Sequence, residues 1–224
     1  PWVSELVTAP KLWPDSHVFT RVAFQVVPVA KLFQCSESGY TCVMVNAVKL
    51  QVKCLHIYTD GSAADSQASW AFCVIAELFD YSFAYCGYHC GDVVTNLNSK
   101  MFLGAQVKDS LNAELSALCW SLLWLLQVPH VPAAQLHYDC QGAASSVQSY
   151  RSSSTNCAIV DFAKVMYFYA TTYLVIDLLN VKGHSGQPWN EHSDRICAHL
   201  LLGDATCLIE KNAAHSIVGL SIHS

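Results

Sequence analysis

A helix-forming segment in the middle of the chain, with strand-forming segments on both sides, most restricts the possible folds. Within residues 110–127, leucines recur at steps of four and three, which is the spacing of one helix face. These leucines are Leu111, Leu115, Leu118, Leu122 and Leu125. Pro129 and Pro132 follow, and proline ends a helix because it lacks an amide donor and clashes with the preceding turn. The segment is therefore predicted to form a core helix.

Strand-forming segments rich in β-branched and aromatic residues precede and follow this helix. The predicted strands are 52–59, 69–77, 79–88, 135–139 and 172–181. The other predicted helices are 141–150, 156–170 and 188–202, and residues 90–108 are predicted to form a polar loop. The order β-β-β-α-β-α-α-β-α predicts a mixed α/β sheet flanked by helices.

The length of 224 residues fits one domain with an appendage. We expect a main domain over residues 51–204 and a tail over 205–224. Residues 1–50 are β-rich, with strand-like segments at 17–33 and 41–50 and a turn at 36–39. This extra N-terminal segment is either a hairpin that packs on the main domain or the end of a preceding domain.

The composition argues for a globular protein that does not depend on non-specific DNA binding. Hydrophobic residues make up 53% of the chain and charged residues 13%, which supplies ample material for a core. The formal net charge of −5 disfavours a protein that binds DNA through its overall charge. An enzyme that meets nucleic acid at a metal site remains compatible, because bound cations reverse the local field.

The sequence also bears on the cellular compartment. Residues 115–138 carry no charge, but Gln127, Pro129, His130 and Pro132 interrupt them, so a membrane span is not expected. Residues 1–10 lack the pattern of a secretory signal. The 11 cysteines are an odd number without regular spacing, which favours reduced thiols. We expect an intracellular protein, nuclear or cytoplasmic, that is not secreted.

Four acidic residues lie where α/β sheets place ligand sites, at strand ends or helix starts. Asp60 and Asp139 end predicted strands, whereas Glu114 and Asp194 lie early in predicted helices. Each also has a structural explanation, since Asp before Gly suits a turn and an acidic residue suits a helix N-terminus.

The residues around these four carboxylates resemble four motifs of the type 1 ribonuclease H family, in the family's order and closest in style to retroelement-encoded versions. The segments are Tyr58-Thr59-Asp60-Gly61-Ser62, Asn112-Ala113-Glu114-Leu115-Ser116-Ala117, Asp139-Cys140-Gln141-Gly142-Ala143, and Val181-Lys182-Gly183-His184-Ser185-Gly186 with Pro188-Trp189-Asn190-Glu191 and Asp194. The resemblance covers roughly residues 52–204 and implies a ribonuclease H-like mixed five-stranded sheet.

The resemblance implies an endonuclease that hydrolyses the RNA strand of RNA–DNA hybrids. The implied metal ligands are Asp60, Glu114, Asp139 and Asp194, which would hold two Mg²⁺ ions, with Mn²⁺ as a substitute. Two divalent cations can activate a water and stabilise the leaving oxygen, and hard oxygen ligands suit these ions. His184 matches the family's loop histidine, which serves proton transfer or product release.

The resemblance also implies contacts with the nucleic acid, although capping or turn hydrogen bonds explain the same residue types. The residues at these positions are Ser62, Ser110, Asn112 and Gln141. The family's basic, Trp-containing substrate handle is missing, because Arg151 and Lys164 are the only basic residues between 142 and 172. We therefore expect that this chain alone binds hybrid weakly and that an attached or separate reverse transcriptase domain is its partner.

Other interpretations of the chain stay open. The domain can be a non-enzymatic remnant or interaction module of a retroelement polyprotein, or a nuclease of the same fold with another nucleic-acid substrate. Cys86, His89 and Cys90 are close enough in sequence to suggest zinc, but no second pair with suitable spacing follows. Burial of these cysteines as core residues is the preferred explanation.

Overall fold

A computed structural model describes residues 33–34, 41–45, 48–128, 130–149 and 157–202 of the chain. Its strands are β1 (Phe33–Gln34), β2 (Thr41–Val45), β3 (Val48–Ala64), β4 (Gln67–Leu78), β5 (Phe83–Asp92), β6 (Ala133–Tyr138) and β7 (Val175–Asn180). Its helices are α3 (Ser110–Leu125), α4 (Gln141–Gln148), α5 (Cys157–Thr171) and α6 (Pro188–Leu201).

Five strands form the main part of a mixed sheet, in the spatial order β5-β4-β3-β6-β7. The β3, β4 and β5 strands pair antiparallel, whereas β6 runs parallel to β3 and β7 runs parallel to β6. The parallel pairs follow from the helices between these strands, since a parallel connection needs a long crossover. The predicted mixed α/β sheet flanked by helices is confirmed, and β1 and β2 extend it to seven strands.

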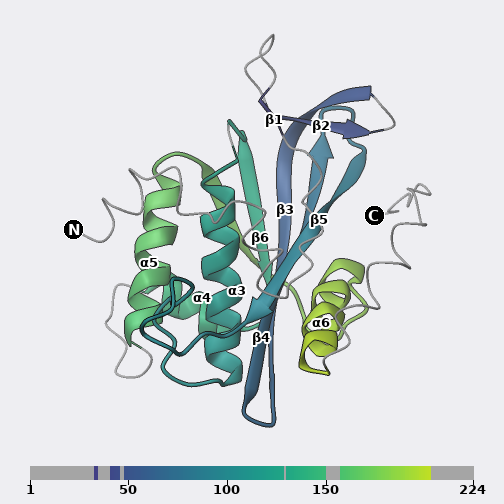
Figure 1. The fold of residues 1–224 in the computed structure, drawn as a ribbon. Helices are drawn as coiled ribbons and strands as arrows, with labels where there is room; N and C mark the ends of the chain where they lie inside the picture. The colour runs from purple at the N-terminus through teal and green to yellow at the C-terminus, as the bar shows by residue number, and fades with distance from the viewer. Residues whose placement is uncertain (1–32, 35–40, 46–47, 129, 150–156, 203–224) are drawn as a thin grey trace.

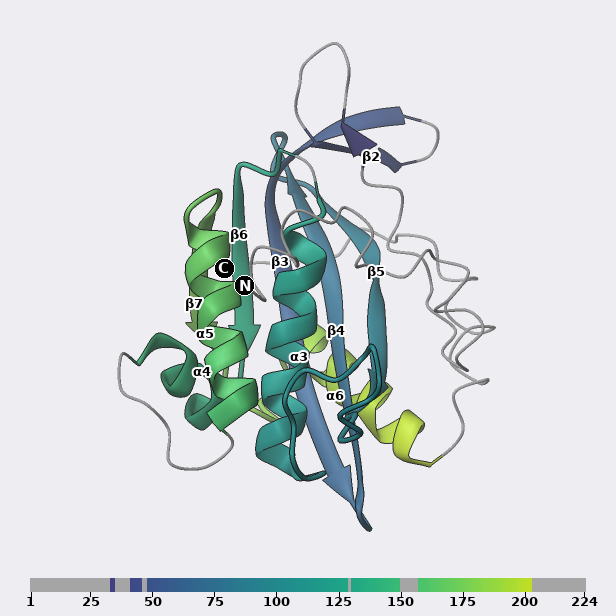
Figure 2. The same ribbon diagram turned by 60° about the vertical axis from the view of Figure 1, so that its left-hand side comes forward.

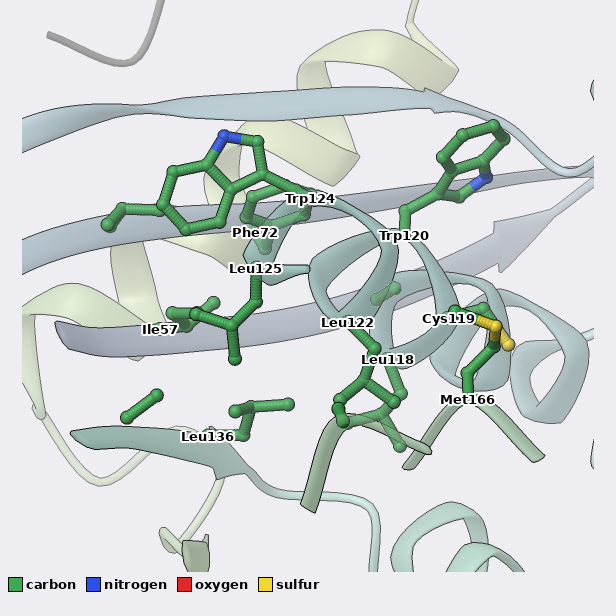
Figure 3. Packing of buried hydrophobic residues seen from close by; sticks show 14 of the residues in the cluster. Ile57, Phe72, Leu118, Cys119, Trp120, Leu122, Trp124, Leu125, Leu136 and Met166 are labelled. Carbon is green, nitrogen blue, oxygen red and sulfur yellow. The ribbon is translucent and has the colours of Figure 1, made fainter. Parts of the chain in front are cut away.

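Helices cover both faces of this sheet (Figures 1 and 2). The α3, α4 and α5 helices lie on one face, and α6 lies on the other, against β3, β4 and β5. Side chains from α3 and α5 meet those of the central strands in the main core, which Figure 3 shows. Fully buried examples are Ile57, Phe72, Leu122 and Leu136. Burial of such a side chain contributes about 1.5–3 kcal/mol.

The α3 helix is buried on nearly all sides, because it lies between the sheet and α5. Its observed end at Leu125 agrees with the predicted end near residue 127. The hydrophobic residues between the leucines, including Trp120 and Trp124, are buried as well. The prediction of a core helix is confirmed.

Several predicted boundaries were wrong, and three of them have identifiable local reasons. The strand predicted at 79–88 begins only at Phe83, because Asp80 Oδ1 accepts hydrogen bonds from the Ser82 amide and hydroxyl and forms a turn. The same strand continues to Asp92, so the loop predicted at 90–108 begins later. The strand predicted at 172–181 begins at Val175, because the Leu174 amide still donates to the Ala170 carbonyl at the end of α5.

The N-terminal β2 strand pairs antiparallel with the first part of β3 and buries Cys42 and Val43. The part of the N-terminal segment that the structure describes therefore belongs to the same sheet. Residues 17–32 of the strand predicted at 17–33, the turn predicted at 36–39 and the tail predicted at 205–224 lie outside the described residues. Among the described helices, none combines the length and apolar character needed to cross a membrane.

Candidate active site

Three of the four predicted carboxylates come together at one edge of the sheet. Asp60, Glu114 and Asp139 each place one carboxylate oxygen within 4.8 Å of the other two. Asp60 lies near the end of β3, and Asp139 directly follows the parallel strand β6. Parallel neighbours end at the same edge, which is where α/β sheets form ligand sites. The pairing of Tyr58 with His137 sets the register that brings the two aspartates together.

Gly61 allows α3 to contribute the third carboxylate. A Cβ atom at residue 61 would lie 2.2 Å from the Glu114 amide nitrogen and 2.3 Å from the Ala113 carbonyl carbon. Any side chain there would therefore push the first turns of α3 away from β3. The Gly61 backbone also hydrogen-bonds Glu114, which partly stabilises the charged form of that carboxylate.

Asp139 is positioned by two residues from the C-terminal part of the fold. The Asn190 side chain donates a hydrogen bond from Nδ2 to Asp139 Oδ2 at 3.1 Å. A Cβ atom at Gly183 would lie 2.8 Å from the same oxygen, so this glycine lets the loop approach the carboxylate. Neither residue was assigned a role from the sequence. Both residues lie in the fourth motif segment, and Asn190 precedes Asp194 by one helical turn and therefore shares its face of α6.

Asp194 lies at the margin of the carboxylate group. Its charge raises the pKa of Asp60 and of Glu114 by repulsion, but its oxygens fall outside the 4.8 Å group. Asp194 Oδ2 instead lies 3.8 Å from His184 Nδ1. The structure thus brings the predicted fourth ligand near the other three, on the side of the loop that carries the histidine.

Burial and mutual repulsion shift the protonation of the two innermost carboxylates. Desolvation, followed by repulsion from Asp139 and Asp194, raises the pKa of Asp60 to about 7. Desolvation, followed by repulsion from Asp60 and Asp139, raises the pKa of Glu114 to about 9. Without a cation, this site therefore retains protons at neutral pH that a bound cation would displace.

The donor set fits hard divalent cations. Asp60 Oδ2 is buried and has no hydrogen-bond partner among the described residues. An unpartnered buried carboxylate oxygen is costly unless a cation satisfies it. The three grouped donors are all carboxylate oxygens, which Mg²⁺ and Mn²⁺ prefer over softer metals.

His184 lies on the exposed loop between β7 and α6. Its side chain is 82% exposed, and its backbone has a φ of 51°, in the left-handed region. The neighbouring Gly186 has a φ of 82°. The loop ends at a well-formed cap, where Gln187 Oε1 accepts hydrogen bonds from the amides of Trp189 and Asn190. The cap fixes the base of the loop, while the histidine ring faces solvent beside Asp194.

The four predicted substrate contacts have different environments. Ser110 and Gln141 are exposed at the starts of α3 and α4, and Ser62 is half-buried two residues after Asp60. Asn112 is 0% exposed and donates from Nδ2 to Asp109 Oδ1 at 2.8 Å. The predicted contact of Asn112 with nucleic acid stays a prediction, and the alternative of a capping role agrees with this placement. Its side chain belongs to the cap of α3.

Cys86, His89 and Cys90, which are close enough in sequence to suggest zinc, are buried in the structure. Burial raises the pKa of both thiols to about 12, and the His89 ring lies 5.2 Å from the ring of Phe72. These residues form none of the groups of potential metal ligands in the described part of the chain. The preferred explanation from the sequence agrees with this placement.

No protein-family model and no curated protein matches the sequence. Among solved structures, the chain is similar to ribonuclease H1 from the halophilic archaeon Halobacterium salinarum NRC-1, with 13% identity and a TM-score of 0.45 over 67% of this chain and 98% of that one. It is also similar to the N-terminal ribonuclease H domain of rv2228c from Mycobacterium tuberculosis, solved as a fusion with maltose-binding protein. There the identity is 14% and the TM-score is 0.49, over 70% of this chain and 98% of that one.

Proposed function

We propose that the protein is an endonuclease that hydrolyses the RNA strand of RNA–DNA hybrids, using two divalent cations. The observation that carries this proposal is the convergence of Asp60, Glu114 and Asp139, with oxygens within 4.8 Å of one another, at the edge of the sheet. Without a cation this group is unfavourable, because burial and like charge both oppose ionisation of Asp60 and Glu114. The motif resemblance of all four segments supports the choice of reaction.

Each proposed ligand has a distinct place in the site. Asp60 offers the buried and unpartnered Oδ2, and Glu114 approaches from the start of α3. Asp139 is oriented by the hydrogen bond from Asn190. Asp194 completes the set from α6. When bound, the cations would supply an activated water and stabilise the leaving oxygen of the phosphodiester.

His184 is proposed to move protons or to assist product release. Its imidazole is exposed and lies beside the Asp194 carboxylate, with 3.8 Å between Nδ1 and Oδ2. An imidazole nitrogen can accept a proton and release it again, which suits a proton-transfer group. The ring can therefore hold a proton at Nδ1 and exchange it with solvent at the mouth of the site.

The substrate is proposed to be bound mainly through the RNA strand. Ser62, Ser110 and Gln141 lie at the starts of elements around the carboxylates, where short polar side chains can contact 2′-hydroxyl groups. The net charge of −5 and the absence of a basic handle predict weak binding by this chain alone. We infer that the protein is derived from a retroelement. An attached or separate reverse transcriptase domain would then supply most of the affinity for the hybrid.

A cleavage assay tests the proposal. A labelled RNA–DNA hybrid is incubated with the full chain in Mg²⁺, in Mn²⁺ and in chelator, beside an RNA duplex and a DNA duplex. We expect cleavage of the RNA strand of the hybrid in both metals and none in chelator. Cleavage of another duplex instead would assign a different substrate, and binding without cleavage would favour a non-enzymatic module.

The Asp60→Asn variant tests the site assignment. Loss of the carboxylate charge at the most buried ligand should reduce cleavage by a hundredfold or more, since even indirect partners of a metal are worth about 10–100-fold. Circular dichroism and the unfolding midpoint check that the fold is retained. Metal-dependent cleavage that persists in Asp60→Asn would argue against the assignment.

A further inference from the structure

A second group of potential metal ligands lies on the same strand as Asp60, away from the carboxylate site. Cys54 and His56 of β3 and Glu77 of β4 each place one donor atom within 4.8 Å of the other two. Cys54 and Glu77 are directly opposite each other across the antiparallel pair. His56 is four residues from Asp60, which separates the two groups by about 13 Å along an extended strand.

The group lies on the sheet face that carries α6, because side chains alternate along β3. Leu55 and Ile57 point into the main core with α3, whereas Tyr58 packs with Ile196 of α6. The side chains of Cys54 and His56 therefore lie on the same face of the sheet as that of Tyr58, nearer the start of β3. The side chains of His56 and Glu77 are 15% and 16% exposed, so an ion can reach them from solvent.

The distances between the donor atoms of Cys54, His56 and Glu77 are close to those between the ligand atoms of a tetrahedral zinc site. With Zn–S near 2.3 Å and Zn–N and Zn–O near 2.1 Å, ligand atoms around zinc lie about 3.4–3.6 Å apart. His56 Nε2 and Glu77 Oε2 are already 3.3 Å apart. The Cys54 sulfur lies within the 4.8 Å limit of the group, so an approach of about 1 Å is sufficient.

Partners outside the group orient two of its ligands, as is usual around bound metals. His137 Nε2 lies 3.3 Å from His56 Nδ1, which leaves His56 Nε2 facing Glu77. The His137 ring stacks on Tyr58 with a centroid distance of 4.1 Å and is thereby held in place. Lys53 Nζ donates to Glu77 Oε1 at 2.6 Å, so the other oxygen, Oε2, faces the site.

We propose that Cys54, His56 and Glu77 bind one zinc ion, with a water in the fourth position. One sulfur, one nitrogen and one oxygen donor form a mixed set that suits Zn²⁺ rather than Mg²⁺. A Cys54 thiolate and the Glu77 carboxylate would balance the two positive charges. The thiol proton is released to solvent on binding, because the thiolate is the metal ligand. The ion would join β3 to β4 at the end remote from the carboxylates.

Cobalt serves as the spectroscopic probe of this site. The full chain, reduced and free of metal, is titrated with Co²⁺. We expect one equivalent to produce a thiolate-to-cobalt charge-transfer band that one equivalent of Zn²⁺ removes and excess Mg²⁺ leaves unchanged. The band should persist in Asp60→Asn, where the carboxylate site is impaired. Absence of a thiolate band in the wild-type protein would overturn the proposal.

Matched cysteine variants locate the ligand. Cys54→Ser should abolish the band, whereas Cys140→Ser, which removes the half-buried thiol next to Asp139, should keep it. The reverse pattern would place the cobalt in the carboxylate site and overturn the proposal. Glu77→Gln provides an independent measurement should Cys54→Ser fail to fold. We expect it to keep the thiolate band and to weaken Zn²⁺ binding at least tenfold, whereas unchanged affinity would contradict the site.

Discussion

Asp60 and Glu114 link the chemistry of the site to the stability of the protein. Both carboxyl groups have a higher pKa in the folded chain than their ordinary values of 3.8 and 4.5. The folded state therefore binds more protons than the unfolded state over this range of pH, and the free energy of unfolding falls as the pH rises. Divalent cations oppose this trend, because they bind the ionised carboxylates more tightly at higher pH.

We predict that in chelator the free energy of unfolding decreases between about pH 4 and pH 9. The decrease from Asp60 is complete near pH 7 and that from Glu114 near pH 9, as their pKa values require. The decrease is large enough to measure, since each pKa unit between the folded and unfolded values corresponds to about 1.4 kcal/mol. Urea unfolding at a series of pH values measures it. In a double Asp60→Asn, Glu114→Gln variant, the free energy of unfolding should no longer decrease over this pH range. An unchanged decrease would show that these two carboxyl groups do not cause it.

Replacement of His184 should lower the rate of cleavage without changing the stability of the protein. Its side chain is 82% exposed, so His184→Ala should change the free energy of unfolding by less than about 0.5 kcal/mol. Loss of the proposed proton-transfer group should lower kcat about a hundredfold. Steady-state kinetics on the hybrid measure the effect. Replacement of the neighbouring Ser185 by alanine is the control, and equal losses in both variants would assign the effect to loop structure.

At the scale of elements, the contact between β3 and α3 builds the site. Gly61→Ala would place a methyl group 2.2 Å from a backbone nitrogen of α3, where neither element can yield easily. We predict a loss of about 3 kcal/mol or more in unfolding free energy and loss of cleavage, because Glu114 moves away from Asp60. Denaturant unfolding and the cleavage assay report the two effects.

Gly142→Ala is the matched control for this prediction. A Cβ atom at residue 142 meets nothing closer than the Cys140 sulfur at 3.9 Å. Because this glycine lies in α4, alanine should stabilise the protein by about 0.5–1 kcal/mol. Equal destabilisation by both substitutions would show that the close approach at Gly61 is not responsible.

The helices and strands were predicted well where local patterns dominate. The leucine spacing and the following prolines placed α3 to within two residues at its end. The turn at Asp80 and the extension of β3 to Ala64 were not predictable. That extension depends on Asp65 and Ser66, which adopt φ values of 49° and 64° in the β3–β4 turn without the glycine that usually signals such a turn.

At the scale of the whole molecule, the order of the motifs predicted the carboxylate site, but pairing between strands could not be read from the sequence. The resemblance gave Asp60, Glu114, Asp139 and Asp194. It did not predict that Asp194 lies outside the group of the other three carboxylates or that Asn112 is buried, since both depend on how the helices pack. The group of Cys54, His56 and Glu77 depends on the register of β3 against β4, which no local pattern encodes.

Anomalous diffraction from crystals soaked in Mn²⁺ tests the central claim most directly, because it locates the cations without reference to activity. We predict manganese peaks in contact with carboxylate oxygens of Asp60, Glu114 and Asp139, and their loss in Asp60→Asn. A well-ordered site with no manganese beside these carboxylates, in crystals that bind the ion elsewhere, would contradict the account.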